Sequence, residues 1–212
     1  MIRLLIADDH AIVRSGLRQI IATTSDLQVV AEAGDGAAVL AAVRGGGCDL
    51  LVMDMTMPGL SGVDLIRRVR TERPTLPILV LSMHNEGQVV SRALKAGAAG
   101  YVAKDCEPDI LLAAMRKVAG GGRFLDPALV DAMVFDSGPA DVDAPPLDLL
   151  SDREYQVLQL VARGQSLNEI GERLNVSAKT VSTHKARLMQ KLGIDNNAEL
   201  VRYAMRHGLL DQ

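Results

Sequence analysis

The sequence predicts an α/β doubly wound fold, with a five-stranded parallel sheet, followed by a small all-α four-helix domain. Over residues 1 to 118, short apolar runs alternate with helical patterns, which indicates successive βα units and a parallel sheet. Several of these apolar runs are followed at once by an acidic, hydroxyl or basic residue. From Leu150 onward the pattern is wholly helical, which indicates a change of domain.

The expected strands span residues 3–7, 29–33, 50–54, 78–82 and 100–103. The expected helices between and after them are Ala11–Ala22, Ala37–Arg44, Val63–Thr71, Gly87–Ala96 and Pro108–Ala119, with Gly or Pro at most joints. Neither glycine triplet, Gly45–Gly47 or Gly120–Gly122, precedes Lys-Ser or Lys-Thr, so we expect no P-loop nucleotide site.

A linker separates the two halves of the chain. Pro127–Phe135 could form one short helix, and the stretch DSGPADVDAPPLD after it is rich in Pro, Asp and small residues, without a periodic apolar face. We therefore expect a first domain over residues 1–120, a short helix and linker over 121–146, and a second domain over 147–212.

The second domain begins with two S-x-x-E capping boxes, at Ser151 and Ser166, each of which starts a helix. Ser177 starts a third helix that ends near Gly193, and a fourth runs from about Asn197 to Gly208. The second and third helices are joined by three residues, the tight connection of a helix-turn-helix.

Composition limits the possible classes of protein. No apolar stretch approaches the roughly 18 residues of a transmembrane span, and the chain enters a strand without a signal-peptide pattern, so we expect a cytoplasmic protein without a membrane partner. Cys48 and Cys106 are not spaced as a CxxC pair, and a cytosolic disulfide is not expected.

Charge is unevenly distributed. The net charge of −3 argues against indiscriminate binding of nucleic acid. From Leu147 onward, however, nine Lys or Arg stand against eight acids, and one segment without any acid holds Lys179, Lys185, Arg187 and Lys191. This segment is a candidate phosphate-binding surface.

A candidate phosphoryl site follows from the polar residues at the strand ends. Asp8 and Asp9 follow RLLIA, Asp54 and Ser82 close LLVMD and ILVLS, and Lys104 follows GYVA. The carboxyl ends of parallel strands form one crevice, so these side chains can converge. Close carboxylates repel by about 4 kcal/mol per pair at an effective dielectric near 20, so a cation is required to keep them ionised.

Mg2+ is the natural cation for such a set of oxygens. We expect Asp9 and Asp54 to be direct ligands and Asp8 to act through water. A carboxylate can also attack phosphorus, and Asp54 is the candidate for an aspartyl phosphate. Lys104 would pair with the phosphoryl oxygens and the Ser82 hydroxyl could donate to one of them.

The motifs LLIADDH, VMDMTMPGLSG, ILVLSMH and GYVAKD closely resemble those of the receiver domain of response regulators, a flavodoxin-like fold. The resemblance covers residues 1 to about 118. It implies phosphotransfer from a histidine kinase to Asp54 and Mg2+ bound by Asp9, Asp54 and the backbone carbonyl of Thr56. It also implies a switch pair formed by Ser82 and Tyr101.

The third helix of the second domain has two different faces. Val181, Leu188 and Leu192 are spaced to face a core. The opposite face carries small residues with basic neighbours: Ser182, Thr183 and Ala186, flanked by Lys179, Lys185 and Arg187. Small residues allow a helix to approach the major groove, and basic flanks bind phosphates. For an isolated segment, a plain surface helix with a basic face is an equal interpretation, and the helix-turn-helix context favours DNA.

The stretch from LLSDREYQVL to RLMQKLGI is similar to the LuxR-type helix-turn-helix, and with the receiver it resembles the NarL/FixJ family. By position, Ser182, Thr183 and Ala186 match the base-facing sites, and Lys179, Thr180 and Lys185 match backbone contacts. The base-facing residues include none of the usual bidentate base readers. The resemblance also implies double-stranded DNA as a partner and a homodimer, with the last helix as core or dimer face.

Three functions are compatible with these motifs. The leading one is a transcription regulator, in which phosphorylation of Asp54 promotes dimeric DNA binding. The second is a phosphohydrolase with an Asp nucleophile and Mg2+, but haloacid-dehalogenase-like enzymes place a D-x-D nucleophile after the first strand, whereas Asp8 and Asp9 are adjacent here. The third is a regulator whose second domain binds a protein instead of DNA.

Overall fold

The computed structural model describes residues 1–83, 87–130, 147–174, 176–207 and 209. The chain divides into two compact units, Met1–Ser137 and Gly138–Gln212. The predicted linker lies almost wholly outside the described residues.

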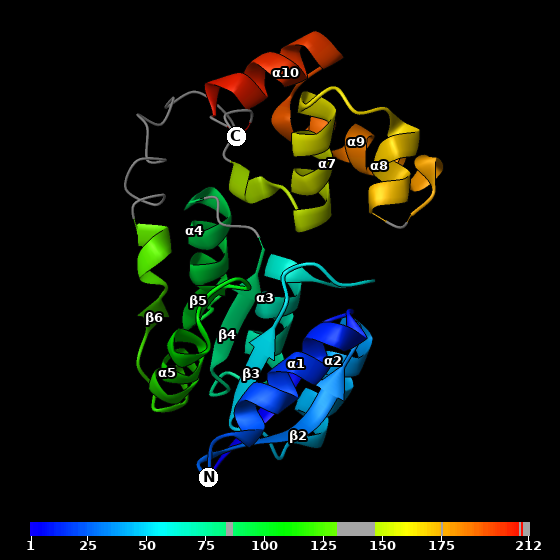
Figure 1. The fold of residues 1–212 in the computed structure, drawn as a ribbon. Coiled ribbons are helices and arrows are strands. Elements are labelled where there is room, and N and C mark those ends of the chain that lie inside the picture. Colours follow the sequence, from blue (N-terminus) through cyan, green and yellow to red (C-terminus); the bar gives the residue numbers. More distant parts are fainter. Residues whose placement is uncertain (84–86, 131–146, 175, 208, 210–212) are drawn as a thin grey trace. The chain divides into compact units, whose positions relative to one another are not determined.

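The first unit is built on a parallel sheet with the strand order β2-β1-β3-β4-β5-β6 (Figure 1). Its strands are β1 Ile2–Ala7, β2 Leu27–Ala33, β3 Leu50–Met53, β4 Ile78–Ser82, β5 Gly100–Ala103 and β6 Phe124–Leu125. Its helices are α1 Ala11–Ala22, α2 Gly36–Gly45, α3 Gly62–Glu72, α4 Gly87–Ala96 and α5 Pro108–Ala119. The doubly wound topology predicted from the alternating pattern is confirmed.

Each face of the sheet is covered by its own helices because neighbouring strand residues point to opposite sides. Leu5 of β1 packs in a core with buried residues of α2, α3 and α4. Leu4 and Ile6, its neighbours, pack in the other core with residues of α1 and α5. The central strands are buried on both faces, which explains why their sequences are continuous apolar runs.

All five predicted strands are present, and the sheet has one more strand than expected, because β6 extends it beside β5. The Phe124 N–H donates to the Ala99 carbonyl at 3.1 Å, and the Asp126 N–H donates to the Tyr101 carbonyl at 3.0 Å. Gly100 permits this approach, since a Cβ there would lie 3.0 Å from the Phe124 carbonyl oxygen. Two strand residues are too few to show a period-2 pattern, so the sequence carried no signal for β6.

Other bounds differ by a residue or two. β2 begins at Leu27 instead of residue 29, and β3 ends at Met53, one residue before Asp54. Of the helix expected over Pro127–Phe135, the structure shows a 3-10 turn, η1 Pro127–Leu129, and the Asp126 side chain caps it by accepting a hydrogen bond from the Ala128 N–H. Residues 131–135 lie outside the described residues.

The second unit consists, in its described part, of a short 3-10 turn η2 Leu147–Leu149 and helices α7 Asp152–Ala162, α8 Leu167–Arg173, α9 Ala178–Leu192 and α10 Asn197–Arg206. Both capping boxes are present, with Ser151 and Ser166 bonded reciprocally to Glu154 and Glu169. The Gly208 at which α10 was expected to end lies outside the described residues.

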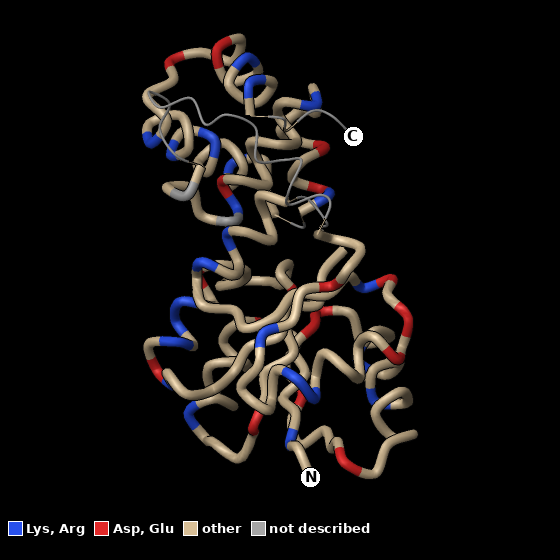
Figure 2. Tube along the Cα trace, turned by 90° about the vertical axis from the view of Figure 1, so that its left-hand side faces the viewer, with Lys and Arg blue, Asp and Glu red and all other residues tan. Residues whose placement is uncertain are grey.

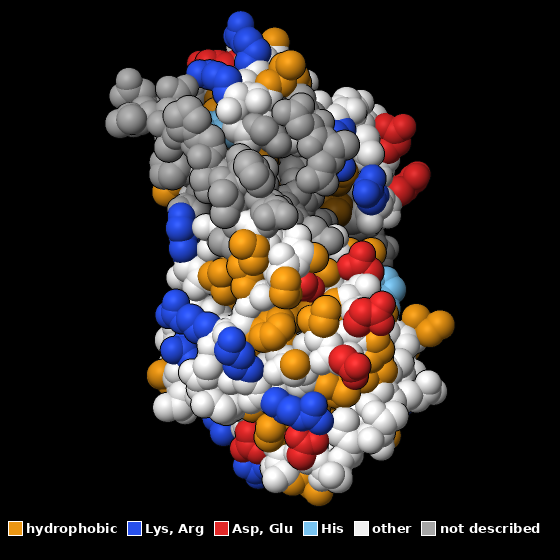
Figure 3. All heavy atoms as spheres, turned by 60° about the vertical axis from the view of Figure 1, so that its left-hand side comes forward, with side chains coloured by type: hydrophobic (Ala, Val, Ile, Leu, Met, Phe, Trp, Pro, Cys, Tyr) orange, Lys and Arg blue, Asp and Glu red, His pale blue; other side chains and the backbone are white. Residues whose placement is uncertain are grey.

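The first unit exposes apolar as well as charged surface. Figure 3 shows hydrophobic side chains gathered in the middle of one face of this unit, with Lys and Arg to one side and Asp and Glu to the other. The exposed large apolar side chains of the unit include Ile12 and Met83, at 83% and 68% exposure.

Candidate functional site

The register of the sheet brings the predicted phosphoryl-site residues together. Ala7 pairs with Met53, so Asp8 and Asp54 both leave the sheet at the same point, and the Asp54 N–H donates to the Ala7 carbonyl at 2.8 Å. Ser82 pairs with Ala103, so Lys104 leaves the sheet beside the end of β4. The convergence expected from the carboxyl ends of parallel strands is therefore observed.

Lys104 connects two of the carboxylates directly. Its Nζ lies 2.6 Å from Asp8 Oδ2 and 2.9 Å from Asp54 Oδ2. Asp8 and Asp54 are both buried, at 1% and 5% exposure, so these are hydrogen-bonded charges in a region of low dielectric. The pairing of Lys104 with Asp8 was not anticipated from the sequence, which linked the lysine to the phosphoryl group.

The environment shifts the pKa values of both partners. Burial raises the pKa of the Asp54 carboxyl above its ordinary value, against the opposing effect of the Lys104 ammonium and a hydrogen bond from the Thr56 backbone. Burial alone would lower the pKa of Lys104, but the attraction of Asp54 and Asp8 outweighs it and raises that pKa. The single lysine thus leaves part of the negative charge at Asp54 uncompensated.

The acidic side chains form a group suited to a cation. Asp8, Asp9, His10 and Asp54 each present one ligand atom, and these atoms lie within 4.8 Å of one another. The Asp9 side chain is 29% exposed, so one side of the group is open to water. Carboxylate oxygens open to water match the needs of Mg2+, which takes one or two carboxylates and retains several waters.

The loop after β3 places Thr56 next to Asp54. Met55 and Met57 on either side are buried in the core, which leaves Thr56 half-buried between them. The loop also packs against the start of α2, because Gly36 has no side chain: a Cβ there would lie 1.9 Å from the Leu60 carbonyl oxygen. The backbone around the candidate acceptor is therefore held by packing on both sides.

The two proposed switch residues are fully enclosed. Ser82 and Tyr101 are both 0% exposed, and the Tyr101 ring packs in the core with α3 and α4 residues. The Ser82 carbonyl accepts a hydrogen bond from the Lys104 N–H at 2.9 Å. Ser82 is therefore tied through the backbone to the residue that holds Asp54.

Two residues of this region were missed by sequence reasoning. His10 lies in the acidic group, and its position directly after Asp8 and Asp9 was the available signal. Arg14, one turn into α1, donates from Nη1 to the Asp8 carbonyl at 2.6 Å and pairs with Glu32 at 3.2 Å. No sequence pattern connects Arg14 with a strand end.

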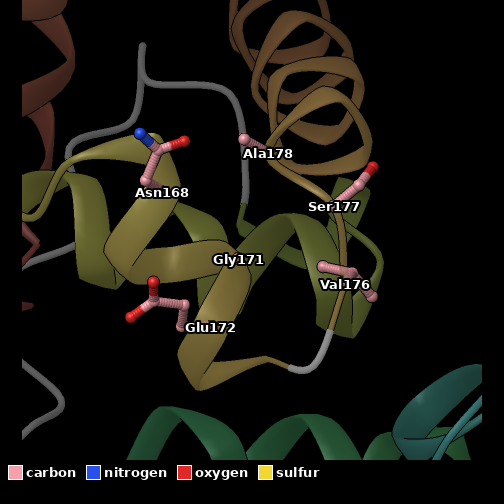
Figure 4. Close-up of a pocket in the computed structure, with 6 residues that line it drawn as sticks. All are labelled: Asn168, Gly171, Glu172, Val176, Ser177 and Ala178. Carbon is pink, nitrogen blue, oxygen red and sulfur yellow. The ribbon is translucent and has the colours of Figure 1, made fainter.

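The turn of the helix-turn-helix depends on a close backbone approach at Gly171. The Val176 N–H donates to the Gly171 carbonyl at 2.9 Å, and a Cβ on Gly171 would lie 2.8 Å from the Val176 carbonyl oxygen. Figure 4 shows the hollow beside this contact, with Asn168 and Glu172 on α8 and Ser177 at the start of α9.

α9 has the two faces that its sequence predicted. Val181, Leu188 and Leu192 are buried. Of the residues assigned to DNA, five are exposed (Lys179, Ser182, Thr183, Ala186 and Arg187) and two are half-buried (Thr180 and Lys185). Figure 2 marks the Lys and Arg positions along the Cα trace in blue and the Asp and Glu positions in red.

Two hydroxyl groups of α9 also have a local role. The Thr180 hydroxyl lies 2.8 Å from the Ser177 Oγ, and Ser177 Oγ accepts the Thr180 N–H at 3.1 Å. The Thr183 hydroxyl donates to the Lys179 carbonyl at 3.0 Å. Thr180 is thus part of the N-terminal cap of α9.

An ion pair joins α9 to α7. Lys191 Nζ lies 2.6 Å from Glu154 Oε2, and Glu154 is 3% exposed. Burial alone would raise the pKa of Glu154, but hydrogen bonds from Lys191 and Ser151 outweigh it and lower that pKa. His184, on the same helix, is half-buried, and burial lowers the pKa of its imidazole.

The chain combines an acidic site suited to phosphoryl transfer, on a doubly wound sheet, with a helix-turn-helix. This combination defines the class of response regulators with a DNA-binding output domain. Family models agree: residues 4–116 match the response regulator receiver domain, and residues 148–204 match the bacterial regulatory proteins of the luxR family. The chain belongs to the NarL/FixJ family of two-component response regulators.

Several curated proteins are similar to this chain over nearly the whole length of both chains. Response regulator UvrY of Escherichia coli K12 is 35% identical over 209 residues, which cover 99% of this chain and 96% of UvrY. Transcriptional regulatory protein UhpA of the same strain is 41% identical over 202 residues, 95% and 97% of the two chains. Among solved structures, the chain is similar to RcsB of Salmonella enterica serovar Typhimurium, which is bound to a promoter in the presence of the phosphomimetic BeF3-. The TM-score is 0.61 and the sequence identity is 32%, and the match covers 95% of this chain and 97% of the RcsB chain.

The family determines the general function. The chain is a two-component response regulator that takes phosphate from a histidine kinase and binds DNA to regulate transcription. This family is a class of DNA-binding regulators and not a class of enzymes. Among the described residues, none of the helices is both long and apolar enough to cross a membrane.

Proposed function

We propose that Asp54 is the phosphoryl acceptor of this response regulator. The observation that carries the proposal is the position of its carboxylate, buried at the end of β3 and hydrogen-bonded to Lys104 at 2.9 Å. One Asp54 oxygen attacks the phosphorus of the kinase phosphohistidine, the P–N bond breaks, and its electron pair stays on the imidazole nitrogen. The product is an aspartyl phosphate.

The acidic group would hold Mg2+ during this transfer. Asp9 and Asp54 and the backbone carbonyl of Thr56 would bind it directly, and Asp8 through water. The ion supplies positive charge that offsets the charge of the incoming phosphoryl oxygens. Lys104, already within 2.9 Å of Asp54, is placed to pair with one of those oxygens.

Phosphorylation would be sensed by the residues tied to Lys104. A phosphoryl oxygen on Asp54 is a new acceptor for the Ser82 hydroxyl, and Tyr101, one strand further, would respond to the movement of β4. Both side chains are fully buried, so a shift of either requires the packing around α4 to change.

The output would be DNA binding through α9 by a homodimer. Ser182, Thr183 and Ala186 would face the bases, and Lys179, Thr180, Lys185 and Arg187 the phosphates. RcsB, of known structure, is bound to a promoter in the presence of a phosphomimetic, which supports DNA binding by the phosphorylated form of this chain. The phosphoacceptor domain would span residues 1–120 and the DNA-binding domain residues 147–212. The protein would be cytoplasmic. It would not catalyse the turnover of phosphate esters.

The test is binding of the full chain to genomic DNA fragments before and after treatment with a small phosphodonor and Mg2+. We expect tighter binding after treatment, and no such gain in Asp54→Ala. Binding that is equally strong with and without phosphodonor would detach DNA binding from Asp54. Absence of DNA affinity in both states would contradict the assignment of α9, and rapid multiple turnover of small phosphate esters would favour the phosphohydrolase.

A further inference from the structure

Thr183 lies on the exposed face of α9, and its hydroxyl proton is already in use. The hydroxyl donates to the Lys179 carbonyl at 3.0 Å, one turn earlier in the same helix. A threonine hydroxyl has a single proton, so this bond leaves no donor for a base. The groups of Thr183 that remain for recognition are the hydroxyl oxygen, as an acceptor, and the γ-methyl group.

Ala186, one turn further along the same face, adds a second methyl group. Residues three apart on a helix are neighbours, and both Thr183 and Ala186 are exposed. Ser182 is also exposed, but its hydroxyl can rotate to donate or to accept and so discriminates little between bases. The two methyl groups are therefore the selective groups at these positions.

A methyl group on the helix matches one feature of the major groove. Each base pair presents its own set of donors and acceptors there, and only thymine presents a methyl group, which alanine and threonine methyl groups can contact. We infer that Thr183 is a specificity-determining residue, whose γ-methyl group, together with the Ala186 methyl group, recognises the 5-methyl group of thymine. The inference rests on the proposed function, because it requires α9 to lie in the major groove.

Uracil tests this inference, because it pairs as thymine does and lacks only the 5-methyl group. The genomic fragment that the phosphodonor-treated full chain binds most tightly is amplified with either thymidine or deoxyuridine triphosphate. Fluorescence anisotropy in Mg2+, at one salt concentration, measures both affinities. We expect the thymine form to bind at least about fourfold more tightly, which is the effect of burying one methyl group. A random duplex made in the same two forms should show no preference, because phosphate contacts carry no sequence information.

Substitutions at Thr183 separate its methyl group from its hydroxyl. Thr183→Ser keeps the hydroxyl and its bond to the Lys179 carbonyl but removes the methyl group, so the preference for thymine should fall by about twofold or more. Thr183→Val keeps a methyl group and removes the hydroxyl, so the preference should remain. Thr71→Ser is the matched control, because Thr71 is an exposed residue of α3 whose hydroxyl makes the same bond, to the Arg67 carbonyl at 2.9 Å.

The outcomes separate this inference from the proposed function. Equal binding of both fragments, or an unchanged preference in Thr183→Ser, would overturn the recognition of thymine and leave DNA binding by α9 in place. A preference that is lost in Thr183→Val and kept in Thr183→Ser would also overturn it, because the hydroxyl oxygen would then make the base contact. If the wild type binds no fragment, the assignment of α9 is wrong as well.

Discussion

At the residue scale, the acidic group is a balance of buried charges. Two carboxylates with less than a tenth of their surface exposed share one ammonium, and the pKa of Asp54 remains raised despite it. A buried charge without its partner is far more costly than an exposed one. Lys104 consequently has a structural role, as the shared counter-charge of Asp8 and Asp54.

Lys104→Met should lower the free energy of unfolding of the metal-free protein by about 3 kcal/mol, because Asp8 and Asp54 lose their shared counter-charge. Urea denaturation in the presence of a metal chelator, monitored by circular dichroism, measures this free energy of unfolding. Arg123→Met, at an exposed position just before β6, is the control and should change the unfolding free energy by less than about 0.5 kcal/mol. Equal effects of the two changes would contradict the charge balance described here.

At the element scale, the output unit depends on how α9 is held by its neighbours. The turn before α9 passes within contact distance of Gly171, and the Glu154 to Lys191 pair joins the far end of α9 to the start of α7. Both contacts determine where the exposed face of α9 points.

Gly171→Ala should destabilise the C-terminal unit by about 1–3 kcal/mol and weaken DNA binding, because the added methyl would lie 2.8 Å from a backbone oxygen that cannot easily move. Gly16→Ala is a matched control: Gly16 lies in α1, with nothing within 4 Å of an added Cβ. That change should be neutral or stabilising, by up to about 1 kcal/mol. Thermal unfolding of both variants measures these changes in stability. An unchanged stability of Gly171→Ala would contradict the close contact at Gly171.

Glu154→Gln should reduce stability in a pH-dependent manner. The pKa of Glu154 in the folded protein lies below its ordinary 4.5, so its ionised form stabilises the fold above that pH, and this contribution is lost as the pH falls through the folded value. We expect a loss of about 2 kcal/mol at pH 7 that shrinks as the pH falls below about 4. Urea titrations at several pH values measure it, and a pH-independent difference would show that the charge is unimportant.

Lys179→Gln should weaken DNA binding to all sequences alike, since the phosphate contact proposed for this exposed lysine carries no sequence information. The slope of log affinity against log salt should fall by about 0.9 for each phosphate contact removed. Fluorescence anisotropy with specific and random duplexes at several salt concentrations provides both values. A change confined to one sequence would instead place Lys179 at a base.

At the scale of the whole molecule, the chain is two compact units with separate cores, Met1–Ser137 and Gly138–Gln212. The acidic group lies in the first unit and the helix-turn-helix in the second. Regulation by phosphorylation must therefore pass from the first unit to the second.

The fragment 147–212 should fold alone and bind DNA with an affinity that a phosphodonor does not change, because it lacks Asp54. The fragment 1–130, which keeps β6 and the buried Leu129, should accept phosphate without binding DNA. Circular dichroism, phosphate incorporation and DNA binding test both. A C-terminal fragment that is unfolded alone would show that its core needs the rest of the chain.

The sequence by itself determined the local features of this protein. The alternating apolar runs predicted the doubly wound sheet, and the S-x-x-E boxes predicted where α7 and α8 begin, because these patterns depend on residues a few positions apart. The polar residues after the strands were recognised because parallel strands end at one edge.

The tertiary structure alone decided what depends on contacts between distant segments. Neither β6 nor the bond from Arg14 to the Asp8 carbonyl leaves a periodic trace in the sequence. The sharing of Lys104 by Asp8 and Asp54, and the approach of His10 to the same group, follow from strand register and side-chain direction. Those quantities are determined by the packing of the whole unit, and a local pattern carries no information about them.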